Sequence, residues 1–228
     1  MTRPASVGDI GIVSKPMPAL YAGLVLLGTL AGCAHRIVAS AQFPQPLLQP
    51  EPLTVGLYID LAFQAYTHHE KLEDHGDWNF VALGPASTAV FHQVLTAKFQ
   101  HVLTLTAPRA QSDDGARIVF RPAIEDFQFS TPEQSKTGFY EVWIKYRVHL
   151  LAADGRELTN WPIAAYGRHR GALIGGADAA LAAAAQLAMR DLAAALALDL
   201  RDPGKLPAVL VDGGKNPAES ATSDPVPQ

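Results

Sequence analysis

The sequence contains one cysteine, Cys33, in 228 residues. A single cysteine excludes an intrachain disulfide framework, and it excludes zinc sites built on two or four cysteines. The chain also lacks a basic excess, because 18 Lys and Arg residues stand against 22 Asp and Glu residues, for a net charge of −4. This balance excludes nucleic-acid binding through overall basicity. Hydrophobic residues make up 48% of the chain, so a core can be buried.

Sequence patterns typical of catalysis are also missing. The chain has no Gly-x-Ser-x-Gly elbow, no phosphate-binding loop, no Gly-x-Gly-x-x-Gly and no His-Glu-x-x-His. An enzyme brings a nucleophile, a base and a stabilising group together. We therefore expect a protein that is not an enzyme and that needs no cofactor.

Long hydrophobic runs are scarce, and the clearest one lies near the N-terminus. Residues 19–32 include fourteen positions without a charge. A membrane-spanning helix needs about 20 apolar residues, whereas the apolar region of a secretory signal has ~7–15 residues behind a positive start. Arg3 and Lys15 supply that start if Met1 is the initiator; initiation at Met17 would remove Lys15. The run therefore predicts a signal peptide over residues 1–32.

The run ends in Leu30, Ala31, Gly32 and Cys33. This tetrad resembles a bacterial lipobox, and the resemblance implies that Cys33 becomes the lipidated first residue of the mature protein. Several acyl chains on one residue anchor a protein stably, whereas one chain binds only marginally. By analogy with enterobacterial sorting, Ala34 in place of Asp implies the outer membrane, with the protein on the periplasmic face. The alternative is a lone cysteine in a core helix.

The rest of the chain divides by composition. Residues 33–52 are expected to be the lipidated cysteine and a Pro/Gln-rich tether, because proline keeps a chain extended. Residues 202–228 contain five prolines and predict a disordered tail. Between them, residues 53–201 are expected to form a single domain.

Alternation of apolar and polar residues predicts four strands in this domain, at 53–60, 118–130, 140–150 and 158–170. The third strand alternates without a break, which is typical of one buried and one solvated face. Asp154-Gly155 after it predicts a hairpin. Pro122 and a change of phase in the second strand predict a bulge or an edge strand. Residues 61–83 show no clean period and are expected to be a long loop that could include a short turn of helix.

Two helices are expected. One opens at Gly84-Pro85 and runs to about His101, followed by a short strand at 102–105. The other is alanine-rich, runs over 179–200 and is capped by Asp178. Charges near its middle disfavour a membrane span and favour packing on a sheet. The predicted fold is α+β: a two-layer sandwich of an antiparallel sheet of about four strands with two helices on one face, in β-α-β-β-β-α order.

With a lipobox, a proline-rich tether and this element order, the chain resembles several small outer-membrane lipoproteins. The LPS-assembly lipoprotein is closest in pattern, and auxiliary lipoproteins of ABC-type transport systems and lipoproteins of the YajG type are similar. The resemblance depends on Leu30–Cys33 and on Tyr146, Val148 and Leu150 before Asp154-Gly155. It implies a non-enzymatic accessory or assembly component of an envelope transport or biogenesis machine, with a membrane contact through the lipid and an envelope protein partner.

Two side-chain groups are weaker candidates for binding sites. Trp143 and Lys145 on one strand, with Arg168 and Arg170 on the next, could contact an anionic lipid or a glycan, or could simply be solvated charges that guard an edge. Alternatively, Trp143 could be covered by the 61–83 loop. His68, His69 and His75 stand among carboxylates and could bind a transition metal, although a solvated loop has the same composition.

Overall fold

The computed structural model describes residues 34–73, 76–111, 115–171, 176–202 and 204–206. The chain divides into two units, Met1–Cys33 and Ala34–Gln228, and the described residues belong to the second. The predicted signal peptide, Cys33 and most of the predicted tail lie outside the described residues. Of the tail, Leu206 is buried at 7% exposure and joins the core.

The larger of two sheets has five strands in the order β5-β2-β6-β7-β8. These are β2 (Glu51–Tyr58), β5 (Phe99–Leu105), β6 (Ile118–Ser130), β7 (Phe139–Ala152) and β8 (Glu157–Arg170). β2 pairs in parallel with β5 and β6, while β6, β7 and β8 are antiparallel. The sheet is mixed, and the prediction of one four-stranded antiparallel sheet was wrong. A helix returns the chain from the end of one strand to the start of a parallel neighbour, and α3 (Leu83–Lys98) does this before β5.

The smaller sheet has three strands in the order β1-β4-β3. β1 (Ala34–Val38) pairs in parallel with β4 (Gly76–Val81), and β3 (His68–Leu72) pairs antiparallel with β4. A short helix, α2 (Leu61–Gln64), precedes β3. The short turn of helix allowed for in the 61–83 loop is thus confirmed as α2, whereas the prediction of a loop for the rest of this range was wrong, because β3 and β4 form there. Trp78 and Phe80 of β4 are buried against Phe129 of β6, so a tertiary contact stabilises strands that have little periodicity of their own.

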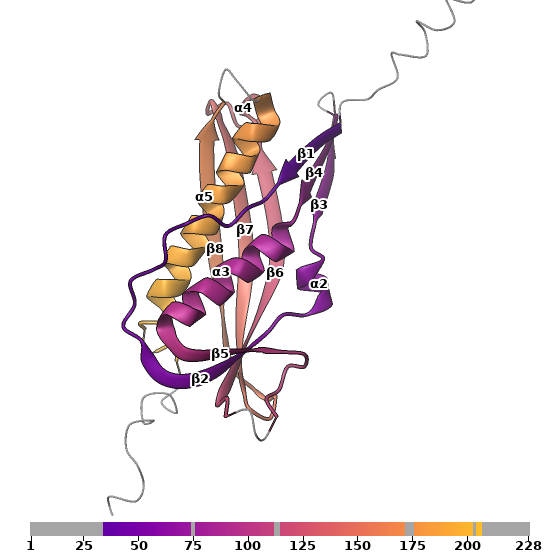
Figure 1. The fold of residues 1–228 in the computed structure, drawn as a ribbon. Coiled ribbons are helices and arrows are strands. Elements are labelled where there is room, and N and C mark those ends of the chain that lie inside the picture. Colours follow the sequence, from indigo (N-terminus) through magenta and orange to yellow (C-terminus); the bar gives the residue numbers. More distant parts are fainter. Residues whose placement is uncertain (1–33, 74–75, 112–114, 172–175, 203, 207–228) are drawn as a thin grey trace, which may run out of the picture. The chain divides into compact units, whose positions relative to one another are not determined.

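Residues 34–50 differ from the expected free tether. Residues 34–38 form β1, and Ile37 is fully buried. The following segment runs along the two long helices (Figure 1), where side chains of the domain bond its backbone: the Gln93 amide donates to the Phe43 carbonyl and Arg201 donates to the Leu47 carbonyl. The proline-rich segment is thus held against the domain.

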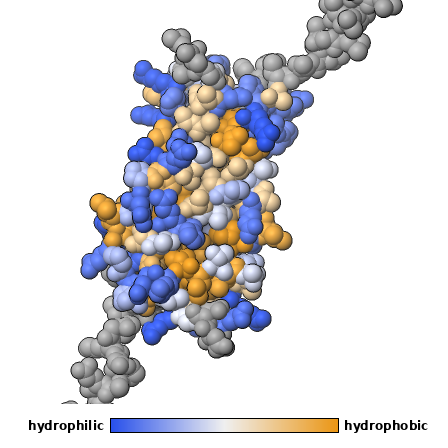
Figure 2. Space-filling model, viewed as in Figure 1, coloured by the Kyte–Doolittle hydropathy of each residue, from blue (hydrophilic) through white to orange (hydrophobic). Residues whose placement is uncertain are grey.

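The two long helices, α3 and α5 (Gly176–Asp199), cover one face of the five-stranded sheet (Figure 1), as predicted. By length and composition α5 could cross a membrane, but it packs on β7 and β8 and buries nine residues in the core. Asp178 lies inside the first turn of α5, where its carboxylate binds His35 of β1, and so does not precede the helix as predicted. Hydrophilic side chains separate the apolar patches on the helical face (Figure 2).

β6 to β8 follow the prediction closely, including the hairpin at Asp154-Gly155. The register of β6 shifts between Ile124 and Asp126, which is the predicted bulge. Pairing with β2 reaches only Val119 and Phe120, so Pro122 lies beyond it. A proline, which has no amide hydrogen, is tolerated where that side of the strand needs no partner.

Candidate functional site

The face of β6 to β8 that the helices leave uncovered carries the predicted binding residues Trp143 and Lys145. Successive side chains of a strand point to opposite faces, so these two project away from buried Val142 and Ile144. Trp143 is 39% exposed. Trp78 and Phe80, which could have covered it, lie in the core instead. The prediction of one buried and one solvated face is confirmed for β7.

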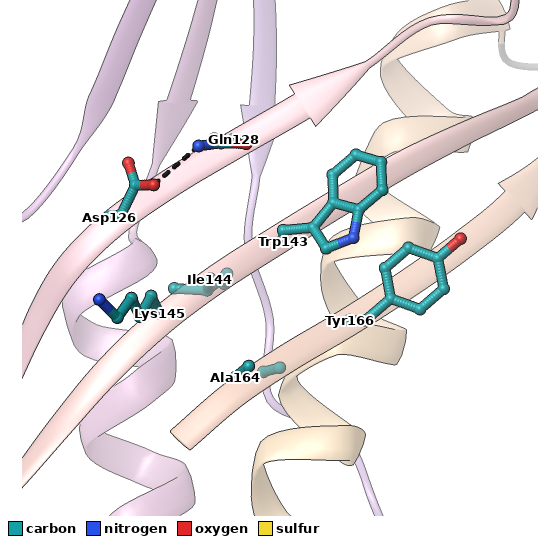
Figure 3. Close-up of a pocket in the computed structure, with 8 residues that line it drawn as sticks. Asp126, Gln128, Trp143, Ile144, Lys145, Ala164 and Tyr166 are labelled. Atoms are coloured by element: carbon teal, nitrogen blue, oxygen red, sulfur yellow. Dashed lines mark hydrogen bonds between the residues drawn. The ribbon is translucent and has the colours of Figure 1, made fainter. Parts of the chain in front are cut away.

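A groove of about 270 Å³ lies beside Trp143 on this open face (Figure 3). Its walls are the rings of Trp143 and Tyr166, whose centroids are 5.2 Å apart. Ala164 stands opposite Lys145 in the strand register, and its small side chain leaves space between them. Asp126 and Gln128 of β6 close the other side. The groove therefore combines two aromatic rings with an amide, a carboxylate and an ammonium group.

The charges near the groove largely pair with one another. The Glu125 carboxylate lies 3.1 Å from the Lys145 Nζ and also binds Arg147. Hydrogen bonds from Arg147 and Lys145 hold the pKa of Glu125 below its usual value. Asp126 accepts a 2.8 Å hydrogen bond from the Gln128 amide. A bulge places two successive residues against one partner, which is how Glu125 and Asp126 both reach this face. The positive charge of Lys145 is consequently offset within the fold.

Tyr166 is held firmly in its place on β8. Its hydroxyl donates to Glu141 Oε1 over 2.8 Å, and its backbone N–H donates to Asp191 of α5 over 2.9 Å. Glu141 is only 7% exposed and also accepts a hydrogen bond from Ser130. Burial, and then the bond to Glu141, raise the pKa of the Tyr166 hydroxyl. One wall of the groove is thus fixed by contacts to β7 and α5.

Arg168 and Arg170 do not line this groove, although Arg168 interacts with the hydroxyl of the wall residue Tyr166. Their guanidinium carbons are 4.8 and 5.0 Å from the centre of the Phe139 ring. Arg168 pairs with Glu141, four residues before Lys145 on β7, and at about 3.3 Å per residue this is roughly 13 Å along the strand. The structure therefore brings the four predicted contact residues together as two separate groups.

The histidines of the predicted metal cluster are also separated. His68 and His69 are neighbours in β3 and so face opposite sides of the strand. His68 packs on Phe127 and lies 3.2 Å from Glu70, whereas His69 lies 3.8 Å from Asp77. His75 lies outside the described residues. Within the part of the chain that the structure describes, no group of three potential ligands is arranged around a metal position.

Sequence reasoning missed Tyr166, although a signal for it was present. Counting outward from a two-residue turn at Asp154-Gly155 pairs Trp143 with Tyr166, and this is the observed register. Asp126 and Gln128 could not be found in the same way, because the bulge in β6 changes the pairing of that strand.

Comparison with known proteins finds no matching family model and no match among curated proteins. Among solved structures, the chain is similar to XCC0632 of Xanthomonas campestris, a DUF330 protein (11% identity, 72% of this chain and 91% of that chain, TM-score 0.44). It is also similar to a candidate lipoprotein of Caulobacter crescentus (17% identity, 52% and 83%, TM-score 0.33). A third similar structure is a candidate homolog of the neuraminyllactose-binding hemagglutinin from Helicobacter pylori (12% identity, 73% and 94%, TM-score 0.42). No residue role is carried over from these proteins.

Proposed function

We propose that this chain is a lipid-anchored protein of the bacterial outer membrane that faces the periplasm. In this role it is a non-enzymatic accessory or assembly component of an envelope transport or biogenesis machine. The observation that carries the proposal is the position of the only cysteine, which ends an apolar run and immediately precedes the folded domain. An envelope protein is the expected partner, and the uncovered face of β6 to β8 is the surface offered to it.

Replacing Cys33 with serine tests the anchor. We expect Cys33→Ser to abolish incorporation of labelled palmitate and to leave the signal peptide uncleaved, because serine lacks the thiol that accepts the lipid. Ala34→Asp is the matched control, since Ala34 is exposed in β1: it keeps the lipid and moves the protein to the inner-membrane fraction. Unchanged palmitate labelling of Cys33→Ser would overturn the proposal. So would an unmodified mass for the mature N-terminal peptide of the wild type.

A second candidate function rests on the groove beside Trp143. Two aromatic rings next to a carboxylate and an amide suit a ligand with apolar faces and hydroxyl groups. Since Glu125 already pairs with Lys145, a neutral glycan fits the groove better than an anionic lipid. In this reading the protein holds a cell-envelope saccharide against Trp143 and Tyr166.

Truncating Trp143 tests the groove. We expect Trp143→Ala to weaken retention on immobilised neutral N-acetylglucosamine oligosaccharides about tenfold or more, because a central aromatic contact is worth ~2 kcal/mol. Leu61→Ala, which truncates another exposed apolar side chain, is expected to bind like the wild type. Equal retention of Trp143→Ala and wild type would remove the saccharide from consideration.

A further inference from the structure

We propose that the end of the domain next to Cys33 rests directly on the membrane, where Arg168 and Arg170 bind phosphate groups of phospholipids. This inference rests on the proposed lipid anchor. It adds a second, electrostatic contact that fixes how the domain is oriented. The bilayer that carries the lipid is thereby also the partner of this arginine pair.

No linker separates the anchor residue Cys33 from the first strand of the domain. β1 begins at Ala34, and consecutive Cα atoms lie about 3.8 Å apart. The next residue, His35, stacks on Trp78 with ring centroids 3.7 Å apart, and its imidazole binds Asp178. A lipid on Cys33 is therefore held one residue from a fixed strand, so the start of β1 must stay near the bilayer surface.

The ends of several other elements lie beside the start of β1. Asp178, which binds His35, is in the first turn of α5 and follows Arg170, the last residue of β8, by eight residues. Phe139, the first residue of β7, pairs with Arg170. The starts of β1, β7 and α5 and the end of β8 thus lie at one end of the domain, the upper end in Figure 1.

Arg168 and Arg170 place two positive charges at this end of the domain. Arg168 and Arg170 are exposed, and among the described residues neither belongs to an ion pair. Their shared contact is the half-buried Phe139 ring, which aligns both guanidinium groups. A guanidinium matches phosphate oxygens in a bidentate way. Of the carboxylates nearby, Glu141 and Asp178 are already bonded within the fold. Arg168 also interacts with the Tyr166 hydroxyl. A guanidinium has five N–H donors, so Arg168 keeps donors for an anion beside those of Arg170.

The net charge of the mature chain strengthens this orientation. Without Arg3, Asp9 and Lys15 of the signal peptide, residues 33–228 have 16 Lys and Arg against 21 Asp and Glu, a net charge of −5. An anionic surface repels this chain as a whole, while the two arginines gathered at the anchored end are attracted. Attraction of each basic residue at such a surface is worth ~1 kcal/mol. In the seated orientation, in which Arg168 and Arg170 contact the membrane, the Asp154-Gly155 hairpin at the far end of β7 and β8 lies away from the membrane.

A spin label near Arg168 and Arg170 shows whether this end of the domain contacts the membrane. Lipidation consumes the only native cysteine, so Thr137→Cys, an exposed position two residues before Phe139, takes the label specifically; Asp154→Cys labels the far hairpin. The lipidated protein is reconstituted into vesicles of phosphatidylethanolamine and phosphatidylglycerol. Accessibility of each label to a water-soluble relaxation agent is then measured, and the lipid is confirmed by the mass of the N-terminal peptide.

We expect the Thr137 label to be shielded and the Asp154 label to be accessible. Arg168→Ala with Arg170→Ala should shift the ratio of seated to unseated protein about thirtyfold toward unseated, and salt should do the same. Arg109→Ala with Arg156→Ala, which removes two exposed arginines from the hairpin end, should change nothing. Equal accessibility of both labels, or shielding that survives loss of Arg168 and Arg170, overturns the inference while the lipid is present. An absent lipid instead overturns the anchor.

Discussion

Replacing Gly167 with alanine is expected to lower the free energy of unfolding by about 3 kcal/mol or more, the upper part of the range for overpacked cores. A Cβ at this position of β8 would lie 2.0 Å from the Ala184 carbonyl oxygen and 2.4 Å from the Ala188 nitrogen. Both atoms belong to the helix backbone, so a change of side-chain rotamer cannot relieve these two clashes. The whole of α5 would have to move away from the sheet and give up part of its packing.

The measurement is the denaturant midpoint of the full-length protein, followed by circular dichroism. Gly171→Ala is the matched control, because its added Cβ would meet only the Tyr140 ring, at 3.2 Å, and a side chain can shift. We expect that variant to lie within about 1 kcal/mol of the wild type. If Gly167→Ala unfolds at the wild-type midpoint, α5 does not pack on β8 as closely as the structure has it.

The alanine-rich helix shows what the sequence can and cannot predict about such contacts. Its small side chains predicted close packing on a sheet, and this was confirmed. Nothing in the local pattern identifies Gly167 as the point of closest approach. A glycine inside a strand can mark a bulge or a neighbouring backbone, and only the pairing of distant elements distinguishes the two.

β6, β7 and β8 could be predicted because their signals are local. The alternation in β7 identifies its two faces, and Asp154-Gly155 identifies the hairpin, although the register shifts between Leu150 and Leu151 beside the turn. β1, β3 and β4 could not be predicted for the opposite reason. β1 pairs with a strand that starts at Gly76, far along the chain, and β3 is almost entirely polar. Its packing depends on contacts such as His68 on Phe127, between residues too far apart in the sequence for a local pattern to include both.

The candidate site divides in the same way. Trp143 and Lys145 were placed on the solvated face from alternation alone. That Glu125 neutralises Lys145 depends on the bulge in β6, and the separation of Arg168 and Arg170 from the groove depends on the register of the hairpin. Local pattern therefore predicted which side chains are exposed, whereas tertiary pairing decides which of them can act on the same ligand.

Replacing Tyr146 with phenylalanine is expected to cost about 1–3 kcal/mol, the cost of leaving a buried polar group without its partner. Tyr146 is fully buried beneath α3 and α5, and its hydroxyl lies 2.8 Å from Ser87 Oγ. In Tyr146→Phe, the Ser87 hydroxyl keeps only a contact of 3.8 Å to the Met189 sulfur. Ser87→Ala leaves the Tyr146 hydroxyl without its hydrogen-bond partner in the same way. The double variant removes both hydroxyls, so its cost should fall short of the sum of the single costs by about 1 kcal/mol.

The same phenol should make the fold sensitive to alkali. Burial raises the pKa of Tyr146 well above its ordinary value of 10.0, against a smaller lowering by the Ser87 hydrogen bond. Because the folded pKa exceeds the unfolded one, the unfolded chain loses this proton first. The contribution is complete below about pH 10 and is lost as pH rises toward the folded pKa, by at most ~1.4 kcal/mol per pH unit. Chemical unfolding at a series of alkaline pH values should therefore show a shallower decline for Tyr146→Phe than for the wild type. Parallel declines, or additive costs in the double variant, would mean that the two hydroxyls are not buried together.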